Sequence, residues 1–159
     1  MERIGFIGVG IMGKPMVQNL MKAGYPLVVH DLNRGPVDEL VEQGATAATS
    51  SKEVAENSDV VITMLPDSPD VDQAVFGSGG VQEGIKSGSL FGDMSSIAPG
   101  TSQKIYESLK TKGVESLDAP VSGGEVGAIA GTLSIMVGGP DEAFKRASPL
   151  FEIMGKNIV

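Results

Sequence analysis

Gly8-Val9-Gly10-Ile11-Met12-Gly13 is a glycine-rich stretch between a short apolar run and a segment with helical spacing of apolar residues. It fits the G-x-G-x-x-G pattern of loops that hold a dinucleotide. Gly8 would permit a tight turn, Gly10 would let a pyrophosphate approach the backbone, and Gly13 would let helix and strand pack closely. The unpaired N–H groups that begin the helix would then face the phosphates. The alternative is a strand-to-helix turn that binds nothing.

Asp31 ends the second apolar run, 18 positions beyond Gly13, close to where such loops place an acidic residue. A carboxylate there accepts hydrogen bonds from the adenosine ribose hydroxyls and repels a 2′-phosphate, which favours NAD over NADP. Arg34, three residues further on, offers a guanidinium that could reach a 2′-phosphate, stack on adenine, or stay in solvent. We therefore predict NAD as the cofactor, with NADP as the alternative.

Three later stretches place polar or small residues directly after strand-like runs: Met64-Leu65-Pro66, Met94-Ser95-Ser96 and Ser122-Gly123-Gly124. In open α/β sheets, ligands bind at this carboxyl edge. The consecutive N–H groups and the hydroxyl of the third stretch would hold an anion, although an ordinary glycine turn explains the same residues. The serines of the second stretch could instead cap the following helix.

Metal and triad chemistry is not predicted. His30 is the only histidine and has no partners in the sequence for a metal site or a triad, so we interpret it as a strand residue. Asp67, Asp70 and Asp72 surround a predicted helix start, where acidic residues complement the helix dipole.

The composition limits the function classes. The chain has 159 residues, 41% hydrophobic content, no cysteine and a formal net charge of −8. This length suits one domain, and no apolar stretch is long enough for a membrane span. The acidic balance, without a basic cluster, argues against nucleic acid or an anionic membrane as partner. We expect a soluble, cytoplasmic protein, since no secretory signal is recognisable, with a small molecule as partner.

Short apolar runs alternate with helical patterns, which is typical of a parallel sheet covered on both faces. The expected strands are 3–7, 27–30, 60–65, 89–93 and 115–118, with weaker ones near Thr46, 133–137 and Ile158. The expected helices are 12–23, 36–43, 52–57, 69–76, 99–112 and 141–154. The sequence thus predicts one α/β domain over residues 1–159, of the Rossmann-type doubly wound class, with a mostly parallel sheet and helices on both faces.

The ordered blocks of the whole chain resemble the β-hydroxyacid dehydrogenase family. The resemblance rests on the glycine motif with Lys14-Pro15-Met16, on Met64-Leu65-Pro66 and Asp93-Met94-Ser95-Ser96, and above all on Asp118-Ala119-Pro120-Val121-Ser122-Gly123-Gly124. It implies cofactor contacts from three loops and a substrate-carboxylate site formed by Ser122, Gly123 and Gly124. The residues given the cofactor role are Gly8, Gly10, Ile11, Met12, Gly13, Asp31, Leu32, Asn33, Arg34, Met64, Leu65, Pro66, Ser95 and Ser96.

The resemblance also implies an activity. Members are NAD(P)-dependent dehydrogenases or reductases that interconvert a short β-hydroxy acid and its oxo acid, of the tartronate semialdehyde/glycerate or 3-hydroxyisobutyrate type. The alternatives are NADPH-dependent reduction of succinic semialdehyde, 6-phosphogluconate or imine chemistry, and a non-catalytic nucleotide-binding module.

The resemblance further places a catalytic lysine in an all-helical second domain, which also dimerises and would begin beyond Val159. We therefore expect a cofactor-binding domain that is inactive alone and whose full-length parent is a homo-oligomer. Gly92 departs from the family, which has an apolar strand residue there.

Overall fold

Six parallel strands form the central sheet of the computed structural model, which describes all 159 residues. Their order is β3-β2-β1-β4-β5-β6. The strands are β1 (Ile4–Ile7), β2 (Leu27–His30), β3 (Thr46–Ala47), β4 (Val60–Thr63), β5 (Leu90–Asp93) and β6 (Glu115–Asp118). The order reverses beside β1, because the chain crosses from one half of the sheet to the other between β3 and β4. The predicted Rossmann-type doubly wound fold is confirmed.

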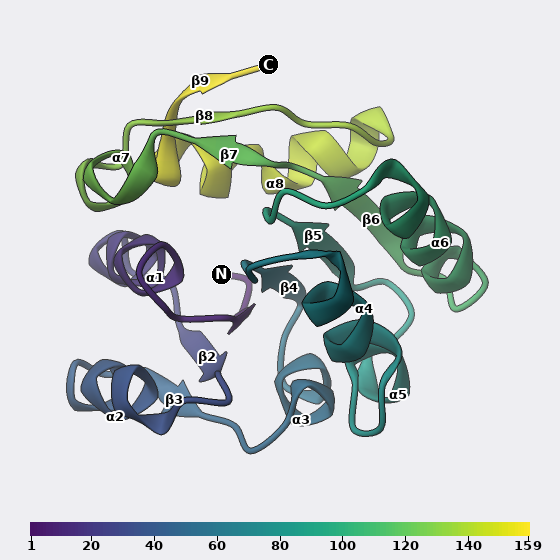
Figure 1. Cartoon of the computed structure of the whole chain (residues 1–159), viewed down its shortest axis with the longest axis horizontal. Coiled ribbons are helices and arrows are strands. Elements are labelled where there is room, and N and C mark those ends of the chain that lie inside the picture. The colour runs from purple at the N-terminus through teal and green to yellow at the C-terminus, as the bar shows by residue number, and fades with distance from the viewer.

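Helices cover both faces of the sheet, each over its own hydrophobic core (Figure 1). The first face is covered by α1 (Gly13–Lys22), α2 (Arg34–Glu42) and α8 (Asp141–Met154), and α7 (Gly124–Ala130) packs against α1. The other is covered by α3 (Ser51–Glu56), α4 (Ser68–Phe76), α5 (Val81–Gly84) and α6 (Pro99–Lys110). Strands β1, β4 and β5 are buried along their whole length, which explains why they read as continuous apolar runs in the sequence.

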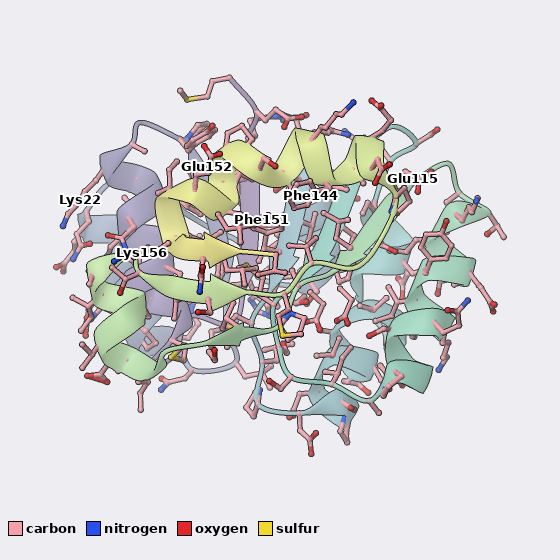
Figure 2. The ribbon with its side chains drawn as sticks, turned by 90° about the horizontal axis from the view of Figure 1, so that it is seen from above. Lys22, Glu115, Phe144, Phe151, Glu152 and Lys156 are labelled. Carbon is pink, nitrogen blue, oxygen red and sulfur yellow. The ribbon has the colours of Figure 1, made fainter.

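A second, three-stranded sheet lies beside α7 and α8 and was not predicted as such (Figures 1 and 2). It consists of β7 (Val121–Ser122), β8 (Leu133–Ile135) and β9 (Gly155–Ile158), with β7 antiparallel and β9 parallel to β8. The weak strands expected near 133–137 and Ile158 therefore exist, but they belong to this sheet. Strand β7 has only two residues and α7 only seven, too few for a visible period.

Side-chain caps set several helix starts. Helix α2 begins at Arg34, two residues before the predicted start, because the Asn33 side chain accepts a hydrogen bond from the N–H of Gly35. Asp67 caps α4 as expected, by accepting from the N–H of Ser68. Helix α6 has Ala98 at its N-cap position with no side-chain cap, so Ser95 and Ser96 do not have the capping role considered for them.

One arginine ties the end of the chain to its beginning. Arg146 of α8 donates from Nε to Glu2 Oε1 at 2.8 Å and from Nη1 to the carbonyl oxygen of Gly88 at 2.7 Å. Its Nη2 reaches the carbonyl oxygen of Asp59 at 3.2 Å. Figure 2 shows Phe144 and Phe151 on the same helix; Phe151 is buried in the core beneath it. The longest helix, α8, has 14 residues, and no helix has the length and apolar character to cross a membrane.

Candidate functional site

The three glycines of the loop between β1 and α1 each meet a different requirement. Gly8 has φ +97°, and a Cβ there would overlap the carbonyl oxygen of Met64. A Cβ on Gly13 would overlap the carbonyl oxygen of Gly8, so α1 packs directly on the turn. A Cβ on Gly10 would meet no atom within 4 Å. Gly8 and Gly13 are thus required by the fold, whereas Gly10 leaves open space for a ligand to reach the backbone.

Nothing in the chain neutralises the positive end of the α1 helix dipole. No side chain caps this ten-residue helix, and its first turn contains no acidic residue. The first N–H groups of a helix carry about half a positive charge together. Because neither a cap nor a carboxylate offsets that charge, this helix end can bind the phosphates of a ligand.

Asp31 is held at the end of β2 by two backbone groups. Its Oδ2 accepts from the N–H of Val9 at 2.8 Å, and its Oδ1 accepts from the N–H of Asn33 at 2.9 Å. A carboxylate has about four acceptor sites, so each oxygen keeps one for a further donor. The geometry therefore fixes the carboxylate beside the glycine loop and leaves it able to accept from two adjacent hydroxyls.

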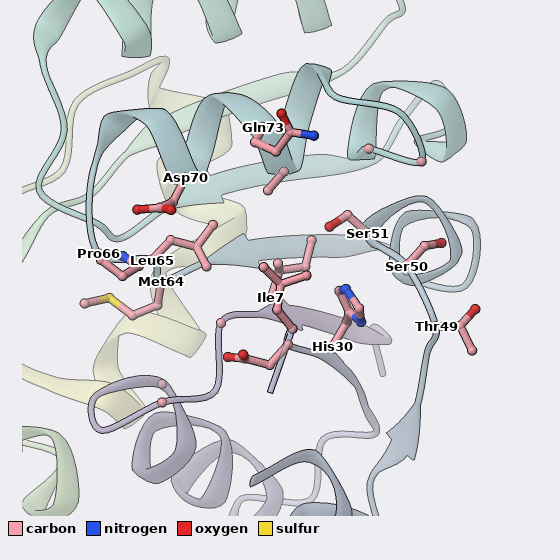
Figure 3. Close-up of a pocket in the computed structure, with 18 of the residues that line it drawn as sticks. Ile7, His30, Thr49, Ser50, Ser51, Met64, Leu65, Pro66, Asp70 and Gln73 are labelled. Atoms are coloured by element: carbon pink, nitrogen blue, oxygen red, sulfur yellow. The ribbon is translucent and has the colours of Figure 1, made fainter. Parts of the chain in front are cut away.

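A cavity of about 670 Å³ opens at this carboxyl edge of the sheet (Figure 3). The glycine loop and the end of β2 form one wall, and α4 forms the opposite wall with Asp70 and Gln73. Ile11 and Leu32, which are 72% and 97% exposed, belong to its lining. These two exposed aliphatic side chains add to a mostly apolar lining, which suits the apolar part of a ligand.

Most of the predicted cofactor residues come together in this cavity. Those that line it are Gly8, Gly10, Ile11, Met12, Gly13, Asp31, Leu32, Met64, Leu65 and Pro66. Four do not line it: Asn33, Arg34, Ser95 and Ser96. Asn33 caps α2, and the Arg34 guanidinium donates to the carbonyl oxygen of Ala48 at 3.3 Å. Ser96 is exposed after β5.

Ser95 lies below the cavity rather than in its wall. Its side chain is fully buried, and its Oγ accepts from the N–H of Leu65 at 2.8 Å. Ser95 in turn donates its own N–H to Oδ1 of Asp93, which also accepts from Thr63 Oγ1 at 2.6 Å. Ser95 therefore positions the backbone at Leu65, just after the end of β4.

The predicted substrate residues lie outside this cavity. Ser122 is exposed and pairs with Ser134 across the small sheet, and none of Ser122, Gly123 and Gly124 lines the cofactor cavity. Gly123 and Gly124 have φ of +133° and +62°, and α7 begins at Gly124. Successive N–H groups in such a turn converge on one point, which suits a carboxylate.

Several cavity residues were not predicted from the sequence. They are Ile7, His30, Thr49, Ser50, Ser51, Asp70, Gln73, Ala74, Ser78, Gly79 and Gly80. His30 is a strand residue as interpreted, but its side chain faces the cavity, with Nδ1 at 3.2 Å from the carbonyl oxygen of Ala48. Residues 49–51 could have been predicted from their position, because they follow β3 and so lie at the same edge of the sheet.

The sheet order, the open helix end, the glycine loop and the carboxylate after β2 together define a dinucleotide-binding Rossmann domain. A family model described as the NAD binding domain of 6-phosphogluconate dehydrogenase matches residues 3–159. The NAD-dependent L-serine dehydrogenase of Pseudomonas aeruginosa is 49% identical over 158 residues, and the 2-hydroxy-3-oxopropionate reductase of Escherichia coli is 47% identical over 157. The chain belongs to the 3-hydroxyisobutyrate dehydrogenase-like β-hydroxyacid dehydrogenases and corresponds to their NAD-binding domain.

The likeness covers nearly all of this chain but only part of its relatives. The two alignments cover 99% and 98% of the chain and 53% of each relative. The 3-hydroxyisobutyrate dehydrogenase of Mycobacterium tuberculosis with L-serine has a TM-score of 0.94 at 35% identity, over 100% of this chain and 54% of that one. The chain spans about half the length of the curated relatives it matches. The predictions of the family and of an NAD- or NADP-binding domain are confirmed.

Proposed function

We propose that this chain binds NAD(H) as the cofactor domain of an oxidoreductase that interconverts a short β-hydroxy acid and its oxo acid. The observation that carries the proposal is the Asp31 carboxylate, fixed by Val9 and Asn33 beside a glycine loop whose helix start is uncapped. Its free acceptor sites suit the two ribose hydroxyls of NAD. The bound cofactor would supply or accept a hydride.

Two contacts support NAD over NADP. A 2′-phosphate would bring negative charge toward Asp31, whose carboxylate cannot turn away without losing its hydrogen bonds to Val9 and Asn33. The Arg34 guanidinium lies by the Ala48 carbonyl oxygen, and its Nη2 is 3.9 Å from Asp38 Oδ1. That carboxylate already offsets part of the positive charge that a 2′-phosphate would need.

The substrate is proposed from the turn at Ser122–Gly124. Its N–H groups and the Ser122 hydroxyl would hold the carboxylate of a hydroxy or oxo acid. The relatives named for L-serine, 2-hydroxy-3-oxopropionate and 3-hydroxyisobutyrate suggest a three- or four-carbon acid. The relative named 2-hydroxy-3-oxopropionate reductase makes that oxo acid the first substrate to assay. The proton donor to the alkoxide is expected to be a lysine beyond Val159, and a cytoplasmic, homo-oligomeric parent remains a prediction.

Fluorescence titration of the chain with NADH and NADPH tests the proposal. We expect saturable binding with NADH preferred, and we expect Asp31→Asn to narrow or reverse that preference because it removes the charge. Glu42→Gln is the matched control, since this exposed acid at the end of α2 lies outside the cavity. Tighter binding of NADPH to the parent chain, or an unchanged ratio in Asp31→Asn, would contradict the assignment of Asp31.

An activity assay tests whether this chain binds cofactor without catalysing the reaction. With NADH and 2-hydroxy-3-oxopropionate, the chain alone should bind cofactor but oxidise none of it. Measurable turnover would show that the proton donor lies within these 159 residues.

A further inference from the structure

A second cavity, of about 610 Å³, lies between α6 and the carboxyl ends of β5 and β6. It shares no lining residue with the cofactor cavity. Phe91 and Ile105 form part of its apolar wall, and Asp93, Asp118 and Ser102 are among its polar residues.

The two carboxylates are neighbours across the sheet. Asp93 and Asp118 are paired in the parallel register of β5 and β6. Side chains alternate between faces along a strand, so Asp93 lies on the same face as Phe91, beneath α6. Like charges at directly paired positions destabilise a sheet. This pair therefore calls for a counter-charge or a shared proton.

Polar atoms of this cavity are left without partners. Asp93 is 2% exposed, and its Oδ1 accepts from Thr63 and Ser95, while its Oδ2 has no hydrogen-bond partner. The Oγ of Ser102, on α6, makes only a weak contact with the Asp118 carboxylate. A buried charged oxygen without a partner is costly. Burial raises the pKa of Asp93 to about 6 and also raises the pKa of Asp118, so Asp93 is still mostly ionised above pH 7.

No basic side chain of the domain forms an ion pair with Asp93 or Asp118. The cavity lining contains no lysine, arginine or histidine. Lys104 of α6 is directed to α4, where its Nζ donates to Asp72 Oδ1 at 2.8 Å. Arg146 is engaged with Glu2 and two backbone carbonyls. The negative charge is therefore offset either by a shared proton or by a cation from outside the chain.

We propose that this second cavity binds a short primary alkylammonium ion. An ammonium group has three N–H donors, which would go to the Asp118 carboxylate and, after a small side-chain shift that uncovers these two buried oxygens, to Oδ2 of Asp93 and Oγ of Ser102. The alkyl part would lie against Phe91 and Ile105. A divalent metal ion suits the site less well, because Mg²⁺ and Ca²⁺ take six or more oxygen ligands and no three acidic or histidine side chains converge here.

Titration of the ¹⁵N-labelled chain with ethylammonium chloride at pH 7.5, followed by ¹H–¹⁵N NMR, tests the proposal. We expect saturable shifts at the amides of residues 93, 102 and 118, and a rise in Tm with ligand concentration. Tetramethylammonium chloride at equal ionic strength has the charge but no N–H donor, so it should cause neither effect. Equal responses to the two salts, or no saturable shift, would overturn the proposal and leave a cavity that holds only water.

Two variants localise the site. Asp93→Asn keeps an oxygen for Thr63 and Ser95 while removing the charge, and Asp118→Asn likewise keeps an oxygen for its weak contact with Ser102. Each should weaken ethylammonium binding at least tenfold, and Asp118→Asn decides the matter if Asp93→Asn fails to fold. Glu115→Gln is the matched control, because this exposed acid begins the same strand that Asp118 ends. An equal loss of binding in Glu115→Gln would show a general charge effect and refute the site.

Discussion

Gly10→Val should separate ligand binding from folding. Gly10 is exposed and is absent from the glycines with positive φ, and a Cβ there meets nothing within 4 Å, so the first carbon of a side chain fits in the free chain. We expect its free energy of unfolding to change by no more than about 0.5 kcal/mol. The same substitution at Gly8 or Gly13 would overlap a backbone carbonyl oxygen and impair the fold itself.

The binding loss for Gly10→Val follows from the open helix end. A valine side chain would occupy the space through which the pyrophosphate reaches the first N–H groups of α1. Losing two hydrogen bonds to a charged group, at about 1.5 kcal/mol each, costs about 3 kcal/mol. That corresponds to about a hundredfold rise in Kd for NADH.

NADH fluorescence titration and urea unfolding of the same samples measure both quantities. Gly100→Val is the matched control, because Gly100 also has open space around its Cβ but lies in the first turn of α6, outside the cavity. A folded Gly10→Val chain that binds NADH within threefold of the parent would refute the assigned role of the loop.

Three stability predictions complete the set. Gly92→Ala should raise the free energy of unfolding in urea by about 0.4–1 kcal/mol, because Gly92 lies inside β5 with room for a Cβ; a loss would reveal a hidden clash. Arg146→Lys should cost about 2 kcal/mol, since one ammonium cannot reproduce the bonds of the guanidinium to Glu2, Gly88 and Asp59, and an unchanged urea midpoint would contradict this. Burial raises the pKa of Asp93 from 3.8 to about 6, so the native state binds this proton more tightly than the unfolded state and stability falls as pH rises between those values. The free energy of unfolding of Asp93→Asn, relative to that of the parent, should therefore rise by about 3 kcal/mol from pH 3.5 to pH 7.5 in urea titrations. A difference that stays constant with pH would show that Asp93 does not titrate this way.

The glycine loop and Asp31 were predictable because their chemistry is local. The loop needs glycine at fixed spacings, and the acidic residue needs only to follow the second strand. The buried strands of the large sheet were predictable for a similar reason, since each reads as an apolar run between helical patterns. These signals depend on residues that are close together in the chain.

The remaining parts of the site depend on distant elements. Nothing in the sequence of α4 shows that Asp70 and Gln73 face the glycine loop, because that follows from how α4 packs on the sheet. The burial of Ser95 was also hidden, since its partner, the N–H of Leu65, belongs to the neighbouring strand end. The pairing of Asp93 with Asp118 requires the register of two strands that a whole helix separates.

The contact between α1 and α7 also determines when the domain can be completed during synthesis. The amide of Asn19 donates to the carbonyl oxygen of Ala128 at 2.9 Å, across 109 positions of sequence. At about 5–20 residues per second, a ribosome needs roughly 5–22 s to make that stretch. For most of this time, one side of α1 has no partner from α7 or α8, although β1 and β2, which α1 contacts, are already made. The nascent chain therefore exposes an unfinished hydrophobic side that chaperones can bind until α8 emerges.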